Sequence, residues 1–558
     1  MIVSLFVGTG EFVMCSINET CSVDLSVTFS FLEYTVSIPV GYTDRGQLEF
    51  VHLIVLGIYT ILFTVLQVRL RAKMFEMERV AHTNLNVMLV NVSKRATKLE
   101  IKELLERYGY GVDNIYLVKK MRPWLRVMNE KCRLKKQYLK ACQKKELVEM
   151  GTLLNELREI DENLDQYYHL ARNDMLYRTS YVIVRLRSED QRDQLLKKSN
   201  IGLATKLAYK LCTCCSPLKL HDQHISAVAA PPPKDLIWQN LESSYCAAWV
   251  KSIISYFVAF VLVLVSSFGA VYLSTHQQET FLANIGVSLL IQFTNIVIME
   301  FLEWSASVED DITHTAAKIS LTFKLTFFQF LNITFMPFII FAYRVFYQES
   351  GTVEERQALT EMTTSVVFIY LGNLLKPLLA VFSIERLMHW WRKRSALKEG
   401  KKSQLSQYEA NLLFEPVEFH IEGFYSSAVA SLMGTFFYLS LVPSVVIVEL
   451  LLMFFLLIAA RHLLFKVCKR PKQFTSLLNR SVNKLSQLCI VIFWAGTIVF
   501  RIMLADRQNF PNKMLAMWDN LYFRIEIGVV GAFLLIIYLF SLDEWFGRKL
   551  ANRQRRNR

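Results

Sequence analysis

The chain has 558 residues, of which 53% are apolar and 13% aromatic, and its mean hydropathy is +0.28. Its apolar residues are gathered into long runs, which argues against a soluble globular protein. A run of about eighteen or more apolar residues can cross a bilayer as a helix, because a helix satisfies its own backbone in lipid. The net charge of +14 would suggest nucleic acid as the partner of a soluble protein. In a membrane protein it reports instead where the loops lie.

The N-terminal segment 1–49 precedes the first apolar run. Residues 1–14 are mildly apolar but lack a basic start, so a cleaved signal peptide fits poorly. The sequon at Asn18 predicts N-glycosylation if this end is outside, and the flanking Cys15 and Cys21 could then pair.

Nine apolar runs predict nine membrane-spanning helices. The first is 50–68, and eight follow in the region 247–545. Their limits are 247–273, 281–302, 316–345, 362–388, 423–441, 444–464, 487–505 and 523–542. The fifth and sixth of the eight are separated only by a short break at Pro443, which predicts a tight hairpin.

Loop charges predict the orientation, because cytosolic loops carry an excess of Lys and Arg. The loops 389–422 and 465–486 and the tail 546–558 are basic, whereas the opposing loops hold few cations. The loop 303–315 breaks the pattern because it is acidic. We expect an extracellular N-terminus and a cytosolic C-terminus. The plasma membrane is the default location, and a vacuolar or lysosomal membrane suits the same topology.

The polar segment 69–246 predicts a cytosolic α+β domain. Strands are expected at 85–92, 115–118 and 179–186, and helices at 97–107, where Thr97 and Glu100 form a capping box, and 189–198. The charged stretch 122–173 predicts an insertion of two antiparallel helices. This order of elements indicates a ferredoxin-like or RNA-recognition-motif-like fold.

Nucleic-acid binding by this domain is disfavoured. RNA-recognition motifs stack bases on aromatic residues of their central strands, and only Tyr181 stands in such a position. We therefore expect a structural domain beneath the membrane bundle.

A proline-rich linker, 230–241, stands directly before the eight-span region. It resembles the signature of the OSCA-type calcium-permeable stress-gated cation channels, also called the hyperosmolality-gated or transmembrane protein sixty-three family. The matching residues are Ala230, Pro231, Pro233, Asp235, Trp238, Asn240 and Leu241. Physically, Asp235 can cap the helix that enters the bilayer, and Trp238 suits the membrane interface.

The resemblance covers about residues 50–545 and implies a fold and a function. The family places an RNA-recognition-like domain with a helical insertion before eight spans. One span carries a Gly-Asn pair, here Gly372-Asn373, and a basic loop follows it, here 389–402. The family usually has eleven spans, two of which would precede residue 50, so whether the short N-terminus is complete stays open. The implied activity is a channel opened by membrane tension or osmotic stress that passes Ca²⁺, K⁺ and Na⁺ in contact with membrane lipid.

Polar residues concentrate in three consecutive spans, which the resemblance places in the pore. The pore-lining or gating candidates are Gln292, Asn295, Glu300, Lys324, Gln329, Asn332, Gly372, Asn373, Lys376 and Pro377. Glu300 would attract cations near the cytosolic mouth, whereas Lys324 and Lys376 either pair with acids or block the path. The amides could equally hydrogen-bond neighbouring helices.

Gly372 and Pro377 would let the fourth of the eight spans bend, since glycine removes packing and proline removes a backbone hydrogen bond. Such a helix could be the gate, although membrane helices carry both residues commonly.

The cysteines Cys212, Cys214 and Cys215 predict S-acylation beside a span. Together with His221 and His224 they fit no standard zinc spacing, so we expect no metal site there. The basic loop 389–402 sets topology and could also contact anionic lipid.

Catalytic motifs for nucleotide, metalloprotease or serine-hydrolase chemistry are missing, so we expect neither an enzyme nor a cofactor. Rival functions are a lipid scramblase that uses the same polar spans, a secondary transporter and a non-conducting scaffold. No internal repeat with paired broken helices supports a transporter. The sequence leaves open whether the chain works as a monomer or a homodimer.

Overall fold

The computed structural model describes a mostly helical chain with a small antiparallel sheet. The described residues are 25–31, 34–41, 85–144, 146–173, 178–199, 219–221, 223–243, 245–276, 280–347, 352–400, 407–439, 441–442, 445–469 and 477–503, with isolated residues at 58–72 and 524–531. The predicted first span 50–68, the last span 523–542, the break at Pro443 and the tail 546–558 therefore lie largely or wholly outside them.

Six helices in this part of the chain are long and apolar enough to cross a membrane. Their apolar stretches are Ala247–Leu273, Asn284–Val308, His314–Phe341, Met362–Lys398, Val445–Val467 and Leu477–Phe500. They belong to α8 (Tyr245–His276), α9 (Thr280–Val308), α10 (His314–Tyr347), α11 (Thr352–Asn373) with its continuation, α16 (Val445–His462) and α17 (Leu477–Met503). The chain is thus a multi-pass membrane protein, as the apolar runs predicted.

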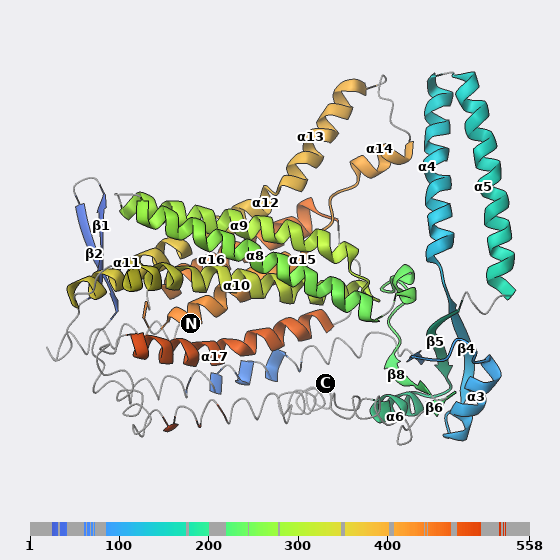
Figure 1. Ribbon diagram of the computed structural model, residues 1–558, viewed down its shortest axis with the longest axis horizontal. Helices are drawn as coiled ribbons and strands as arrows, with labels where there is room; N and C mark the ends of the chain where they lie inside the picture. The colour runs from blue at the N-terminus through green and yellow to red at the C-terminus, as the bar shows by residue number, and fades with distance from the viewer. Residues whose placement is uncertain are drawn as a thin grey trace.

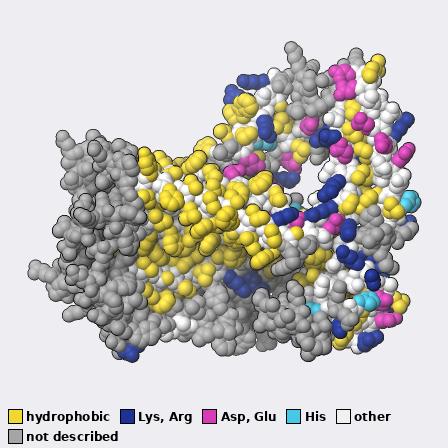
Figure 2. Space-filling model, in the orientation of Figure 1, with side chains coloured by type: hydrophobic (Ala, Val, Ile, Leu, Met, Phe, Trp, Pro, Cys, Tyr) yellow, Lys and Arg dark blue, Asp and Glu magenta, His cyan; other side chains and the backbone are white. Residues whose placement is uncertain are grey.

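The helices lie side by side in one bundle, with the sheet domain at one end (Figure 1). Large apolar side chains remain exposed on the outside of the bundle; on α8, for example, Phe257 and Phe268 are 66% and 75% exposed. Figure 2 shows this apolar surface on the bundle, whereas charged side chains gather over the sheet domain and the helices beside it. An apolar exterior of this kind is stable only against lipid.

The continuation of α11 corrects two expectations. The predicted span 362–388 is interrupted after Asn373, and α12 (Lys376–Val381) and α13 (Ile384–Glu399) follow. Pro377 stands in the first turn of α12, where its missing N–H costs little. Of the predicted loop 389–402, residues 389–399 are helical and belong to α13, because the Trp, Arg, Lys, Leu and Ala residues there are adequate helix formers. Helix α14 (Gln407–Phe414) follows α13.

A further helix, α15 (Ile421–Tyr438), occupies the predicted span 423–441 but is not among the six. It packs between α10 and α17, and many of its residues are small and buried, including Ser426, Ala430, Ser431 and Gly434. The aromatic end of α15, with Phe437 and Tyr438, belongs to the main apolar core. After α16 the chain makes one π-helical turn, η6 (Leu463–Val467).

The sheet domain is built from β3 (Asn86–Val90), α3 (Lys98–Arg107), β4 (Val112–Lys119), β5 (Arg178–Leu186), α6 (Glu189–Ser199) and β8 (Ser226–Ala229). Its strands are antiparallel in the order β4-β5-β3-β8. The three predicted strands, both helices and the capping box of Thr97 and Glu100 are confirmed. Strand β8 was not predicted, because four small residues carry too weak a pattern.

Two helices, α4 (Arg122–Lys144) and α5 (Leu147–Asn173), occupy the interval where antiparallel helices were expected. They pack on each other along their length through Leu134, Ala141 and Leu153 and project beyond the sheet (Figure 1). Outside these units lie two hairpins, β1 (Leu25–Phe31) with β2 (Tyr34–Gly41) and β6 (Lys219–Leu220) with β7 (Gln223–His224).

The linker 230–241 ties the sheet domain to the bundle, but not as predicted. Asp235 does not cap α8, the next helix in the chain. Its carboxylate Oδ1 accepts from the backbone N–H of Thr315 at 2.9 Å, and its carbonyl accepts from His314, so it caps α10. The linker folds back because Leu236 pairs with Thr313 and the short helix η4 (Trp238–Glu242) buries Leu241.

Acidic side chains of the loop between α9 and α10 form ion pairs with basic side chains of α4, α8 and α10. Asp310 forms ion pairs with Arg122 at the start of α4 and with Lys251 of α8, the latter at 2.7 Å. Glu309 pairs with Lys324 of α10. These pairings neutralise Glu309 and Asp310 within the fold.

Lowering the pH is expected to weaken the link at Asp310. Burial opposes its ionisation, but hydrogen bonds from Lys251 and Arg122 outweigh burial and hold the pKa of Asp310 below its usual value of 3.8. Its stabilising contribution is therefore complete above about pH 4 and is lost as the pH falls through the lowered value. Thermal unfolding midpoints of the wild type and Asp310→Asn should differ at pH 6 and converge towards pH 3. A constant difference across this range would contradict the assignment.

Candidate functional site

A partly open cavity, with polar and charged side chains set in a mainly apolar lining, lies between α9, α10, α12 and the start of α15. Its volume is about 170 Å³. The polar and charged lining residues are Gln292, Asn295, Glu300, Glu303, Gln329, Lys376, Ser383, Glu385, Arg386, His420 and Ser427. The apolar lining includes Met299, Leu379, Phe424 and Leu456. Polar and charged groups among apolar helices are costly unless they face water or a partner.

Buried amides join neighbouring helices at the deep end of the cavity. The Gln292 side chain donates to Oδ1 of Asn373 at 2.7 Å, joining α9 to the end of α11. Asn332 of α10 donates to Oδ1 of Asn295 at 2.9 Å and to the carbonyl of Ile291 at 3.3 Å. All four amide side chains are at most 5% exposed. Their contacts match the helix-to-helix use of amides that the sequence left open.

Several polar atoms here have no hydrogen-bond partner among the described residues. They are Nδ2 of Asn295, Oε1 of Gln329, Nδ2 of Asn373 and Nζ of Lys376. Three of these side chains line the cavity, and each is at least nine-tenths buried. Buried polar groups are nearly always hydrogen-bonded, so a set of unpartnered polar atoms in one part of the bundle is unusual.

The helix break stands beside the cavity. After Asn373 the backbone makes two tight turns, in which Leu374 donates to Leu371 and Leu375 donates to Gly372. Gly372 lies against Ser288 of α9 so closely that a side chain on it would collide with the Ser288 hydroxyl. Lys376, the first residue of α12, brings its ammonium group to the cavity directly after the break.

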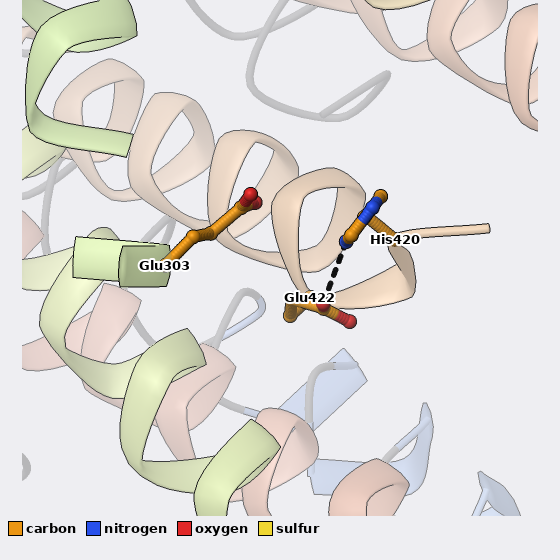
Figure 3. Close-up of side chains that lie close together, drawn as sticks. All are labelled: Glu303, His420 and Glu422. Atoms are coloured by element: carbon orange, nitrogen blue, oxygen red, sulfur yellow. Dashed lines mark hydrogen bonds and ion pairs between the residues drawn. The ribbon is translucent and has the colours of Figure 1, made fainter. Parts of the chain in front are cut away.

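The mouth of the cavity carries opposed charges. His420 contacts Oε1 of Glu422 at 3.2 Å and Oε2 of Glu385 at 3.3 Å, and Glu303 of α9 lies opposite (Figure 3). The hydrogen bond to Glu422 raises the pKa of His420 to about 9, against the opposing effect of burial and with further help from Glu303. Lys318 of α10 donates to both oxygens of Glu422, at 3.1 and 3.0 Å.

The structure gathers half of the ten candidate pore residues around this cavity: Gln292, Asn295, Glu300, Gln329 and Lys376. Asn332 donates a hydrogen bond to Asn295, and Asn373 accepts one from Gln292, but Asn332 and Asn373 do not line the cavity themselves. Gly372 and Pro377 flank the helix break and do not line the cavity. Lys324 is elsewhere, in a buried ion pair with Glu309, which is one of the two uses that the sequence allowed.

Three functional candidates, His420, Glu422 and Glu449, were not predicted from the sequence. His420 and Glu422 lie at the start of α15, in what the sequence presents as the end of a loop. Glu449 is fully buried in α16 and accepts from the Ser431 hydroxyl at 2.5 Å. Its signal was available, because Glu449 is the one acidic residue in the apolar run Val445–His462.

Other predicted sites lie outside the described residues: Asn18 and the cysteines Cys212, Cys214 and Cys215. Of the histidines near those cysteines, His221 lies 3.8 Å from Glu100 and His224 is in β7. The linker residues that carry the family resemblance run from the sheet domain to α8, and Asp235 and Leu241 among them are buried.

Comparison with protein-family models gives no match, and comparison with curated proteins gives no similar sequence. The residues and their geometry are therefore the basis for the function proposed below.

Proposed function

We propose that this protein is a mechanosensitive, osmosensitive cation channel that passes Ca²⁺, K⁺ and Na⁺ and is gated by membrane tension, with no enzymatic role. The observation that supports this proposal most is the set of polar and charged side chains that line a cavity among lipid-facing helices. It combines an acidic mouth with unpaired buried polar atoms at its deep end. Intramembrane polar groups on such a scale are retained where a polar solute passes.

The proposal includes nine spans, an extracellular N-terminus, and location in the plasma membrane. It also includes a ferredoxin-like cytosolic domain. The strand order β4-β5-β3-β8, with α3 and α6 as crossovers, supports that assignment. The resemblance of the linker 230–241 to the OSCA-type channels is consistent with the same function.

Cations would be concentrated by the carboxylates at the mouth. Glu300 is exposed there, whereas Glu303 and Glu385 are already influenced by His420. Deeper in the bundle the amides Gln292, Asn295 and Gln329 could replace part of an ion's hydration shell. Lys376 stands at this level, and its charge would oppose cation passage while it remains there.

The gate we propose is the break between α11 and α12. It is the point where the backbone ladder is already interrupted, so movement of α12 costs few hydrogen bonds. Membrane tension favours whichever state occupies more area, and so shifts an existing equilibrium. A tilt of α12 that carries Lys376 out of the cavity would open the path.

Neutralising Glu300 is expected to reduce the current. One carboxylate beside the path is worth about 1 kcal/mol at 4 Å in water, so Glu300→Gln should lower single-channel current about two- to fivefold at low salt and less at high salt. The measurement is patch-clamp recording on purified protein in liposomes under suction. Glu162→Gln, an exposed carboxylate on α5, is the matched control.

Two outcomes would overturn the proposal. Folded, inserted protein that stays silent at all tensions is not a channel, and lipid-probe exchange in the same liposomes would then identify a scramblase. Silence in both assays would favour the scaffold. Tension-activated currents that are indifferent to Glu300→Gln would place the pore elsewhere.

A further inference from the structure

A compact set of metal-ligand atoms lies at the cavity mouth. Glu303 comes from the last turns of α9, whereas His420 and Glu422 come from the start of α15 (Figure 3). One ligand atom from each residue lies within 4.8 Å of the other two. Zinc bound at about 2.0–2.2 Å in a tetrahedron separates its ligand atoms by about 3.3 Å, so the side chains must move closer together. The imidazole nitrogen that binds must also release its proton and its present contact with Glu422 or Glu385.

The cluster has unused acceptor capacity. Oε1 of Glu303 is buried and has no hydrogen-bond partner among the described residues. Oε1 of Gln329, whose side chain is 4% exposed, lines the same cavity and is likewise unpartnered. Glu303 and Gln329 thus each hold a buried acceptor oxygen without a partner and line the same cavity, and a bound cation would satisfy such an oxygen.

The donor set selects the class of cation. One imidazole nitrogen with two carboxylates is typical of zinc and similar first-row transition ions, whereas calcium and magnesium prefer oxygen alone. Lys318 holds Glu422 from the other side through both of its oxygens. That contact orients Glu422, as an outer-shell partner does, but its positive charge also competes with a bound cation.

We propose that Glu303, His420 and Glu422 form a binding site for a divalent transition cation of the zinc type, with water completing the coordination. Occupancy would add two positive charges at the mouth and tie α9 to α15. The site is distinct from the permeation function proposed above and does not depend on it, because it concerns binding at equilibrium.

The test uses the full chain in detergent, with Cys212, Cys214 and Cys215 changed to serine so that they contribute no ligands. Zn²⁺ binding is measured by calorimetry, and Co²⁺ is used as a spectroscopic probe of tetrahedral coordination. We expect one equivalent of Zn²⁺ that is lost, or weakened about 10- to 100-fold, in His420→Gln and Glu303→Gln. Lys318→Gln should tighten binding, because it removes the competing charge. His462→Gln, an exposed histidine on α16, is the matched control and should bind as the parent does.

Two results would overturn the site. Zn²⁺ binding that is unchanged in His420→Gln means that the ion is held elsewhere on the chain. Ca²⁺ that competes with Zn²⁺ at equal concentration means that the imidazole is not a ligand. Thermal unfolding of each variant establishes that it is folded, so lost binding cannot be ascribed to misfolding. Since no current is recorded, failure here leaves the channel proposal standing, and silence in the patch-clamp assay leaves this site standing.

Discussion

Replacing Lys324 with methionine is expected to cost about 3–5 kcal/mol of folding free energy, the largest effect we expect from any single side chain in the bundle. The ammonium group of Lys324 lies 2.5 and 2.6 Å from the two oxygens of Glu309, and the residues are 2% and 7% exposed. It also faces the ring of Tyr256 at 5.2 Å. The substitution leaves a buried carboxylate without its cation. The unfolding midpoint of purified protein in detergent should fall accordingly.

The double variant Lys324→Met with Glu309→Gln separates the value of the pair from the cost of an orphaned charge. Removing both charges should recover most of the loss, since a buried ion pair is often no better than a neutral replacement. Lys131→Met is the control, because its ion pair with Asp161 on the α4–α5 hairpin is partly exposed and should matter by less than about 1 kcal/mol. A single Lys324 variant as stable as the parent would rule out the buried pair.

Gly496→Ala is expected to disrupt the contact between α15 and α17, at a cost of about 3 kcal/mol. A side chain on Gly496 would collide with the carbonyl oxygen of Phe437, and it would lie 3.0 Å from the carbonyl carbon. Backbone cannot move aside as a flexible side chain can, so the two helices must separate. The neighbouring cluster of Phe437, Tyr438 and Phe500 would loosen with them. Unfolding midpoints and the yield of monodisperse protein both report the effect.

Gly286→Ala is the matched substitution for Gly496. It also lies in a spanning helix, but a side chain there would meet only Leu273 at 3.7 Å, an ordinary packing distance. It should therefore change stability little or even raise it, since alanine favours helix more than glycine does. Equal losses for the two variants would show that glycine is needed for another reason than close packing.

Apolar runs and a capping box predicted many of the helices and strands of the fold. Long apolar stretches predicted the six candidate spans, and the pair Thr97 and Glu100 predicted the start of α3, because both signals depend on residues near one another in the chain. The prediction of a loop at 389–402 was wrong, since abundant charge is typical of a loop and equally of an exposed helix such as α13.

Contacts between residues that lie far apart in the sequence could not be predicted from such local signals. Asp235 was expected to cap the next helix, but the helix it caps begins 79 residues later, at His314. Likewise, the polarity of Gln292 and Asn373 marked them as candidates without showing that they bond to each other. The grouping at the cavity mouth could not be predicted from the sequence either, because five helices separate Glu303 from His420 in the chain.

The α9–α10 loop also constrains the order in which the protein can assemble. During synthesis, the sheet domain with β8 is complete before α9 emerges, and N-terminal units fold first. Arg122 and Asp235 are then in place, but their partners Asp310 and Thr315 belong to chain that is not yet made. The helices α9 and α10 must enter the membrane before the loop between them can dock on the sheet domain, which has already folded. The docked loop would therefore mark the stage at which the first three helices of the bundle have been correctly inserted.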